Sequence, residues 1–93
     1  MDGLTQFREE LNKIDSQLIL LISERFKIIH SVGIYKKENE IAVMQSDRVE
    51  EVKNRCAKIG SQFNLNEDFI KQLYDLIIKE ACRIEGMIIN EEQ

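Results

Sequence analysis

Apolar residues recur at every third or fourth position through the first third of the chain. The series consists of Leu4, Phe7, Leu11, Ile14, Leu18, Leu21, Ile22, Ile28, Ile29 and Val32. This spacing is typical of one face of an α-helix, so it predicts a helix that runs to about Lys37. Gly33 is the only weak point inside it, and the chain contains no proline, the strongest helix breaker.

Two shorter helices follow in the pattern. Residues 38–45 show no helical period and are expected to form a loop. Ser46 is expected to cap a second helix that ends near Gly60, because serine is a common N-cap and glycine a common helix stop. After a turn, Asn66 is expected to cap a third helix that runs to about Ile89. The fold class is therefore all-α, with three helices per subunit, one of them very long.

The length of the first helix bears on the oligomeric state. A helix of roughly 34 residues is about 50 Å long, whereas a compact chain of this size has a radius of gyration of only ~12 Å. Two shorter helices cannot cover an apolar stripe of that length. We therefore expect one domain over residues 1–93 that forms an intertwined homodimer. The alternative is a monomeric three-helix bundle.

Composition and charge narrow the classes of function. Hydrophobic residues make up 43% and charged residues 32% of the chain, which suits a folded, helix-rich, water-soluble protein. A net charge of −4 and the absence of a basic stripe argue against nucleic acid as a partner. Cys56 and Cys82 have no metal-binding spacing; buried thiols in a reducing compartment are expected, and a disulfide is the alternative. With neither a signal peptide nor a membrane-spanning run, a cytoplasmic protein is expected.

Three basic residues lie on or beside the apolar side of the first helix. Arg25 and Lys36 are three helical turns apart, so they project from the same side and would repel each other unless they bind an anion. Arg8 precedes Arg25 by about 25 Å of helical rise. It can reach a pocket that holds Arg25 only from another chain. The alternative for each residue is that its charged end extends to water along an apolar stem.

A fourth basic residue, Arg48, opens the second helix next to the predicted loop. A cation is unfavourable at a helix N-terminus, which makes an anionic ligand nearby more plausible. Arg48 is therefore a candidate pocket residue. The alternative is a surface ion pair with Asp47 or Glu51.

Glu85 is the acid whose position is unusual, because it shares an apolar side of the third helix with Ile78 and Cys82. An acid in such surroundings is expected to be neutral and able to donate a hydrogen bond. The alternative is an ion pair with Lys79 or Arg83 at the edge of the stripe. The single histidine has no partner residues that would make a triad or a metal site.

Together these residues resemble a known family. The string KIDSQLILLISER followed by VGIYK, with Arg8, Arg25, Lys36, Arg48 and Glu85 at their spacings, is similar to the all-α, type II chorismate mutases. The resemblance covers nearly the whole chain. It implies an entwined dimer with two active sites, each built from both chains. It also implies an isomerase that converts chorismate to prephenate without metal or cofactor.

The resemblance also implies roles for individual residues. Arg25 and Arg8 from the partner subunit would hold the two substrate carboxylates. Lys36 would bind a carboxylate and the ether oxygen of the breaking bond, and Glu85 would face that oxygen. Arg48 and the backbone near Gln45 would line the pocket at the ring substituent. A [3,3]-sigmatropic (Claisen) rearrangement needs no nucleophile and no proton transfer, so positioning and fixed charges are the main contributions.

The chain departs from the family pattern at two further pocket positions. Val49 replaces a glutamate that bonds the ring hydroxyl, and Ala81 replaces a small polar residue. The strings VMQSDRVEEVK and LYDLIIKEACRIE resemble the subgroup that acts on 4-amino-4-deoxychorismate. A valine after the arginine is also similar to isochorismate–pyruvate lyases, although these tend to carry glutamine at the position of Glu85. Chorismate ranks first, the amino analogue second and the lyase third. A helical dimerisation or regulatory module, in which the charged residues do not converge, is the non-enzymatic alternative.

Overall fold

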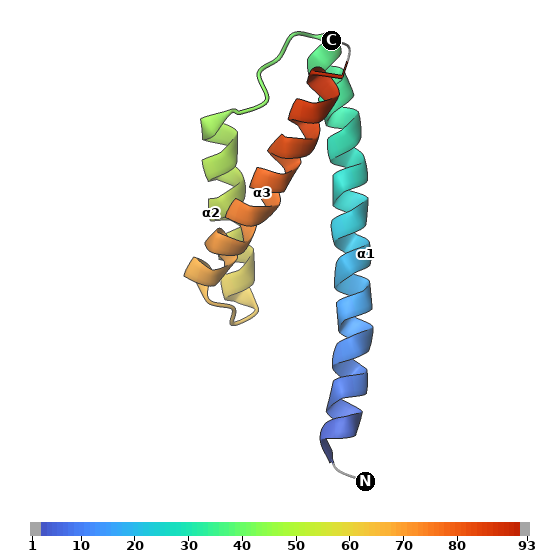
Figure 1. Ribbon diagram of the computed structural model, residues 1–93. Coiled ribbons are helices and arrows are strands. Elements are labelled where there is room, and N and C mark those ends of the chain that lie inside the picture. Colours follow the sequence, from blue (N-terminus) through green and yellow to red (C-terminus); the bar gives the residue numbers. More distant parts are fainter. Residues whose placement is uncertain (1–2, 92–93) are drawn as a thin grey trace.

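The computed structural model describes residues 3–91 and consists of three α-helices. These are α1 (Gly3–Glu38), α2 (Ser46–Gln62) and α3 (Glu67–Ile89). Figure 1 shows α1 as one long rod, with α2 and α3 beside its C-terminal half. Within the described range there is no strand, so the predicted all-α, three-helix fold is confirmed.

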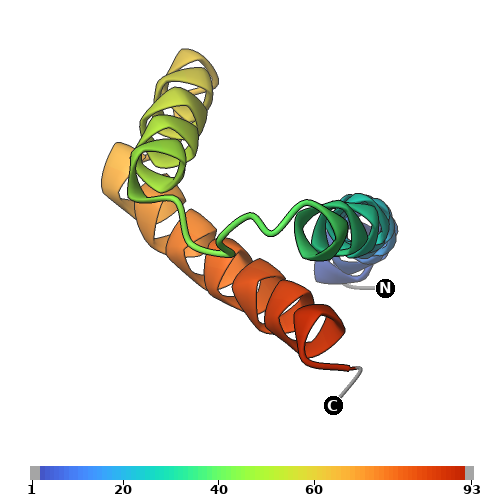
Figure 2. The same cartoon turned by 90° about the horizontal axis from the view of Figure 1, so that it is seen from above.

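Helix α3 is the centre of the arrangement. It packs against α1 on one side and against α2 on the other, and α1 and α2 do not pack against each other (Figure 2). The radius of gyration is 16.9 Å and the longest dimension is 58 Å, well above the ~12 Å radius of a compact chain of this length. Within the single chain, α1 therefore does not close a three-helix bundle with α2 and α3.

Helices α1 and α3 approach most closely at Gly33, which is buried. A Cβ atom there would lie 2.9 Å from Cδ1 of Ile88 and 3.3 Å from the Cα of Glu85. The absence of a side chain at Gly33 thus lets the backbone of α3 come next to α1. The glycine that looked like a weak point in the helix is a contact point between helices.

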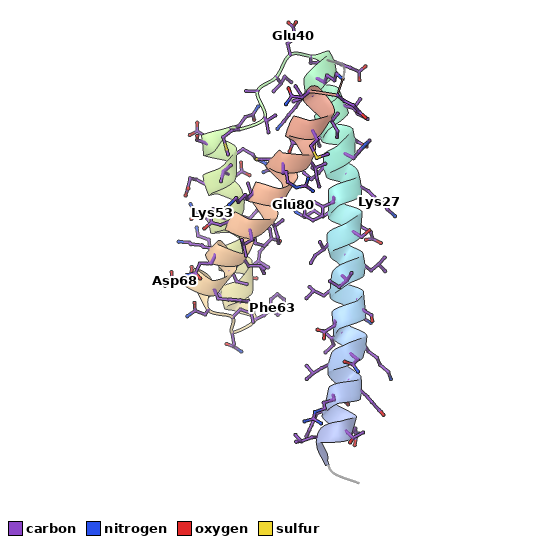
Figure 3. The ribbon with its side chains drawn as sticks, viewed as in Figure 1. Lys27, Glu40, Lys53, Phe63, Asp68 and Glu80 are labelled. Atoms are coloured by element: carbon purple, nitrogen blue, oxygen red, sulfur yellow. The ribbon has the colours of Figure 1, made fainter. Side chains whose placement is uncertain are left out.

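The N-terminal half of α1 has no covering element in the single chain. Large apolar side chains stay exposed along it, for example Phe7 at 62%, Leu11 at 55% and Leu18 at 52%. Figure 3 shows side chains extending from the N-terminal end of α1, below the level that α2 and α3 reach. Among residues 3–91, the buried hydrophobic residues all belong to α2 and α3: Val52, Ala57, Ile70, Ala81 and Ile88.

The predicted cap and end of α3 are confirmed, whereas the predicted cap and stop of α2 differ from the structure. Asn66 caps α3 as predicted, since its side-chain oxygen accepts a hydrogen bond of 2.8 Å from the Phe69 amide. Ser46 does not cap α2 but is its first residue, and Gln45 occupies the cap without a side-chain hydrogen bond. Gly60 does not end α2, which runs on to Gln62.

Gly60 has a packing role instead. A Cβ atom on it would lie 2.9 Å from Cγ1 of Ile70, so the glycine permits close approach of α2 and α3. Near the start of α2, the loop of residues 39–45 leads from the end of α1 across to α2 (Figure 2). This loop and the three helices position the site described next.

Candidate active site

A cavity of about 180 Å³ lies among α1, α3, the loop of residues 39–45 and the start of α2. Seven of the eight pocket residues predicted from the sequence line it: Arg25, Lys36, Gln45, Arg48, Val49, Ala81 and Glu85. Apolar side chains of Ile29, Val32, Val43, Val52 and Ile78 complete the wall, together with Cys82. Three separate helices therefore bring the predicted polar residues to one place.

An ion pair crosses the cavity from α1 to α3. Nζ of Lys36 lies 2.7 Å from Oε1 of Glu85, and their side chains are only 15% and 6% exposed. Glu85 is 4% exposed, and it is the one charged residue within 3–91 that is buried. Because the pair is shielded from water, the attraction between its charges is much stronger than at the surface. Glu85 is thus half of an ion pair across the helices, which differs from the neutral donor expected from its apolar surroundings, and its partner is neither Lys79 nor Arg83 of its own helix.

The ammonium of Lys36 also ties the loop to α1. Nζ donates a hydrogen bond of 2.9 Å to the carbonyl oxygen of Val43. A lysine ammonium carries three N–H donors. One is donated to Val43, and the ion pair with Oε1 of Glu85 is made without a hydrogen bond, so N–H donors remain for a ligand in the cavity.

Arg25 is the second cation of the cavity. Its guanidinium carbon lies 5.8 Å from the centre of the Tyr74 ring, at the outer end of the range for a cation–π contact. Its Nη1 is buried and has no hydrogen-bond partner among the described residues. A buried donor without a partner costs free energy, which a ligand oxygen would recover. Arg25 is thus suited to bind an anionic group.

The start of α2 contributes the less enclosed side of the cavity. Arg48 lines it, but its side chain is 57% exposed and Nη1 lies 2.9 Å from Oε1 of Glu51. Both sequence interpretations of Arg48 therefore hold at once, as a cavity residue and as a surface ion pair. Val49 is half-buried beside it and offers the cavity only an apolar side chain.

Arg8 is the predicted residue that does not reach the cavity. It is exposed near the N-terminal end of α1, and the cavity is built at the other end of that helix. Figure 1 shows that α2 and α3 do not extend to this end. Within one chain Arg8 and Arg25 cannot contact the same small ligand.

Cys82 is a cavity residue to which the sequence gave no role. Burial raises the pKa of its thiol, the negative charge of Glu85 adds to the rise, and Lys36 opposes it. The thiol is therefore protonated near neutral pH and acts as an apolar wall. The only signal in the sequence was its position on the apolar side of α3, one turn before Glu85.

Other kinds of site find little support in residues 3–91. His30 is exposed and lies outside the cavity. No three His, Cys, Asp or Glu side chains of the described range come together as metal ligands. None of the three helices, over the described residues, is both long and apolar enough to cross a membrane.

Comparison with known proteins identifies the family. Residues 7–86 match the model of the family described as chorismate mutase type II. A 4-amino-4-deoxychorismate mutase of Streptomyces venezuelae is 34% identical, over 96% of this chain and 86% of its own length. Another of that name, from Streptomyces pristinaespiralis, is 31% identical over 90% of this chain and 65% of its own.

A bifunctional chorismate mutase/prephenate dehydratase of Buchnera aphidicola is 28% identical over 97% of this chain. The match takes up only 23% of that longer protein. The family match covers most of the chain and includes four charged residues of the cavity, Arg25, Lys36, Arg48 and Glu85. The chain therefore belongs to the chorismate mutase type II family and is an isomerase of that kind.

Proposed function

We propose that the protein catalyses the [3,3]-sigmatropic rearrangement of a chorismate-type dicarboxylate, with conversion of chorismate to prephenate as the first candidate. One observation carries this proposal. The cavity combines a buried Arg25 N–H without a partner and a Lys36 ammonium with a free donor. These groups suit a ligand that has carboxylates and an ether oxygen.

The chemistry follows from what these groups can stabilise. In the rearrangement a C–O bond breaks while a C–C bond forms, and negative charge develops on the ether oxygen. An N–H of Lys36 that is not bonded to Val43 is the donor for this oxygen, and Arg25 binds a carboxylate. Glu85 holds the Lys36 ammonium in place, so little reorganisation is needed when the charge develops. Holding the two reacting ends of the substrate together supplies the rest.

A homodimer with shared active sites completes the proposal. The accessible surface of the chain is 7581 Å², whereas a compact monomer of this mass exposes about 5,600 Å². Exposed apolar residues on the N-terminal half of α1 account for part of the excess. A second copy would cover them, and its Arg8 would reach the cavity. The 180 Å³ cavity of one chain is smaller than the ~300 Å³ at the low end for small-molecule sites, which also favours a site completed by a partner.

The second candidate substrate is 4-amino-4-deoxychorismate. Two of the similar proteins carry that substrate in their names. In addition, Val49 gives the cavity no acceptor for a ring hydroxyl. Isochorismate–pyruvate lyase activity ranks third, because this chain has Glu85 where such lyases tend to have glutamine. A purely structural helical module fits poorly with charged residues that converge on one cavity.

A side-by-side assay tests the proposal. Purified protein is given chorismate, 4-amino-4-deoxychorismate or isochorismate, and kcat/KM is measured from substrate loss with product identification. Rearrangement of either of the first two supports the mutase function, and the larger kcat/KM names the substrate. Pyruvate release from isochorismate as the dominant reaction, or no turnover of any of the three by folded protein, contradicts it.

The cysteines and the net charge bear on where the protein is located and what it binds. Cys56 and Cys82 are free thiols, which suits a reducing compartment such as the cytoplasm. The net charge of −4 disfavours nucleic acid as a partner. We therefore propose a cytoplasmic enzyme whose only macromolecular partner in catalysis is its own second copy.

A further inference from the structure

Arg25 lies against an aromatic ring, and no acidic residue in the described range 3–91 forms an ion pair with it. Its guanidinium carbon is 5.8 Å from the centre of the Tyr74 ring, and the contact links α1 to α3. Its hydrogen-bonding capacity is not exhausted, because Nη1 is buried without a partner. Ile78, one helical turn after Tyr74, lines the cavity, so the contact is at the cavity's edge.

Tyr74 is itself fixed from the opposite side. The residue is half-buried in α3, and the side chain of Cys56 from α2 lies beside its hydroxyl. Burial raises the pKa of the Tyr74 hydroxyl and its interaction with Cys56 raises it further, while the charge of Arg25 acts in the opposite direction. The ring therefore stays neutral at physiological pH, and its position is defined by contacts with both other helices.

The type of contact matters for ligand binding. A carboxylate partner would take up guanidinium N–H groups, and the substrate would then have to compete for them. An aromatic face attracts the cation without using a hydrogen-bond donor. It can thus restrict the orientation of a long, flexible side chain and leave the N–H groups for a substrate carboxylate. The Arg25 side chain then loses less rotamer freedom when the ligand binds.

We propose that Tyr74 is a positioning residue that orients Arg25 for the substrate carboxylate through its ring face. The inference depends on the role of Arg25 in the proposed function, and it adds a residue that does not itself contact the substrate. Cys56 supports the same arrangement, because it lies beside the hydroxyl of Tyr74.

The test compares two substitutions of Tyr74 with a matched control. Tyr74→Leu removes the ring, and we expect KM for the substrate to rise roughly 3- to 30-fold, the range of cation–π contacts, with kcat changed far less. Tyr74→Phe keeps the ring and should restore most of the affinity. Phe69→Leu removes a ring from the same helix at an exposed site and should leave KM unchanged. Thermal unfolding of each variant reports whether the fold persists.

Arg25→Met, alone and combined with Tyr74→Leu, separates this inference from the proposed function. If Tyr74 acts through Arg25, Tyr74→Leu causes no further rise in KM once the guanidinium is gone. Independent, multiplying effects on KM would overturn the inference, as would a Tyr74→Phe variant as impaired as Tyr74→Leu. Normal kinetics in Arg25→Met would instead remove Arg25 from the proposed function. If Tyr74→Leu leaves KM unchanged while Arg25→Met impairs the enzyme, the inference about Tyr74 is refuted and the proposed function is not.

Discussion

Lys36 combines three tasks in one ammonium group. It pairs with Glu85, it holds the carbonyl of Val43, and it keeps N–H donors for a ligand. Glu85 is nearly inaccessible to water, so its charge depends on this partner. Loss of one member of a buried ion pair is far more costly than loss of both, because it leaves a charge in surroundings of low polarity.

A pair of substitutions uses this asymmetry to separate stability from catalysis. Lys36→Met should destabilise the fold by about 3–5 kcal/mol, since it leaves Glu85 unpaired. Adding Glu85→Gln should restore much of that stability but not the activity. We expect kcat of the double variant to be about 10²- to 10³-fold below that of Glu85→Gln alone, the loss typical of one electrostatic donor. Unfolding in urea and steady-state kinetics measure the two effects.

Lys27→Met is the matched control for Lys36→Met. Lys27 is exposed on the same helix, and Figure 3 shows it directed away from α2 and α3. Its substitution should change stability by no more than about 0.5 kcal/mol and leave kcat unaltered. Normal turnover by a folded Lys36→Met/Glu85→Gln variant would rule out the role proposed for the ammonium.

The pKa of Tyr74 leads to a prediction about alkaline pH. Because burial raises this pKa above its ordinary value of 10.0, the folded state holds the phenol proton more tightly than the unfolded state. The resulting stability is fully present below about pH 10 and is lost as pH rises from there through the folded pKa. Tyr74→Phe has no proton to lose and should show a shallower decline. Unfolding free energies measured from pH 8 to 11 at one chain concentration would show the difference, and parallel curves would contradict it.

At the scale of the helices, two glycines in contrasting positions show what determines the approach of α1 to α3. Gly33 has no room for a methyl group, whereas a Cβ atom on Gly86 would have no other atom within 4 Å. Both lie inside long helices, where alanine is intrinsically better than glycine by about 1 kcal/mol. The same substitution is thus expected to act in opposite directions at the two sites.

Gly33→Ala should lower the free energy of unfolding by about 1–3 kcal/mol, because it overpacks the contact with Ile88 and the backbone of Glu85. It should also reduce kcat/KM, since the shift moves Glu85 relative to Lys36. Gly86→Ala should raise stability by up to about 1 kcal/mol. Equal effects of the two substitutions in urea unfolding would show that helix propensity, and not the contact at Gly33, dominates.

The sequence was a good guide to the helices and a poorer guide to their contacts. Helical periodicity and the absence of proline were enough to predict three helices, and the Asn66 cap was correct. The pattern could not show why Gly33 and Gly60 are glycines, because the reason is an atom from another helix that is distant in sequence. Propensity rules describe a residue within its own segment, and both glycines were therefore taken for weak points or stops.

For the site, the sequence predicted most of the residues but not their contacts with one another. The cavity contains Arg25, Lys36 and Glu85 as expected, because each is a charged residue on or beside an apolar side of a helix. The pairing of Glu85 with Lys36 was not foreseen, since the sequence suggested only neighbours on the same helix as partners. Tyr74 was not singled out either, because an aromatic residue in a helix resembles any other core residue until its neighbour across the helices is known.

At the scale of the whole molecule, the length of α1 leads to a prediction about which subunit supplies each residue of a site. Arg8→Ala and Arg25→Ala subunits should each be nearly inactive. When they are unfolded together and refolded as a 1:1 mixture, half of the dimers are mixed, and one of their two sites has both arginines. Activity should return to roughly a quarter of the wild-type value for random pairing in a two-fold dimer.

The matched control is a mixture of Arg25→Ala with Lys36→Ala. Both residues belong to the same chain's half of a site, so no combination of subunits restores an intact one, and activity should stay low. Recovery in this control, or its absence in the first mixture despite demonstrated subunit exchange, would contradict sites shared as proposed. Sedimentation at several concentrations would establish the dimer independently.

The bond between Lys36 and the Val43 carbonyl has one more consequence. The amine that we propose for the reaction also holds the loop of residues 39–45, so occupancy of the cavity and opening of that loop are expected to be thermodynamically linked. Amide protons of the loop then act as a built-in reporter. The rate of their exchange with deuterium should change when a dicarboxylate binds. In Lys36→Met the exchange should be faster with or without a ligand.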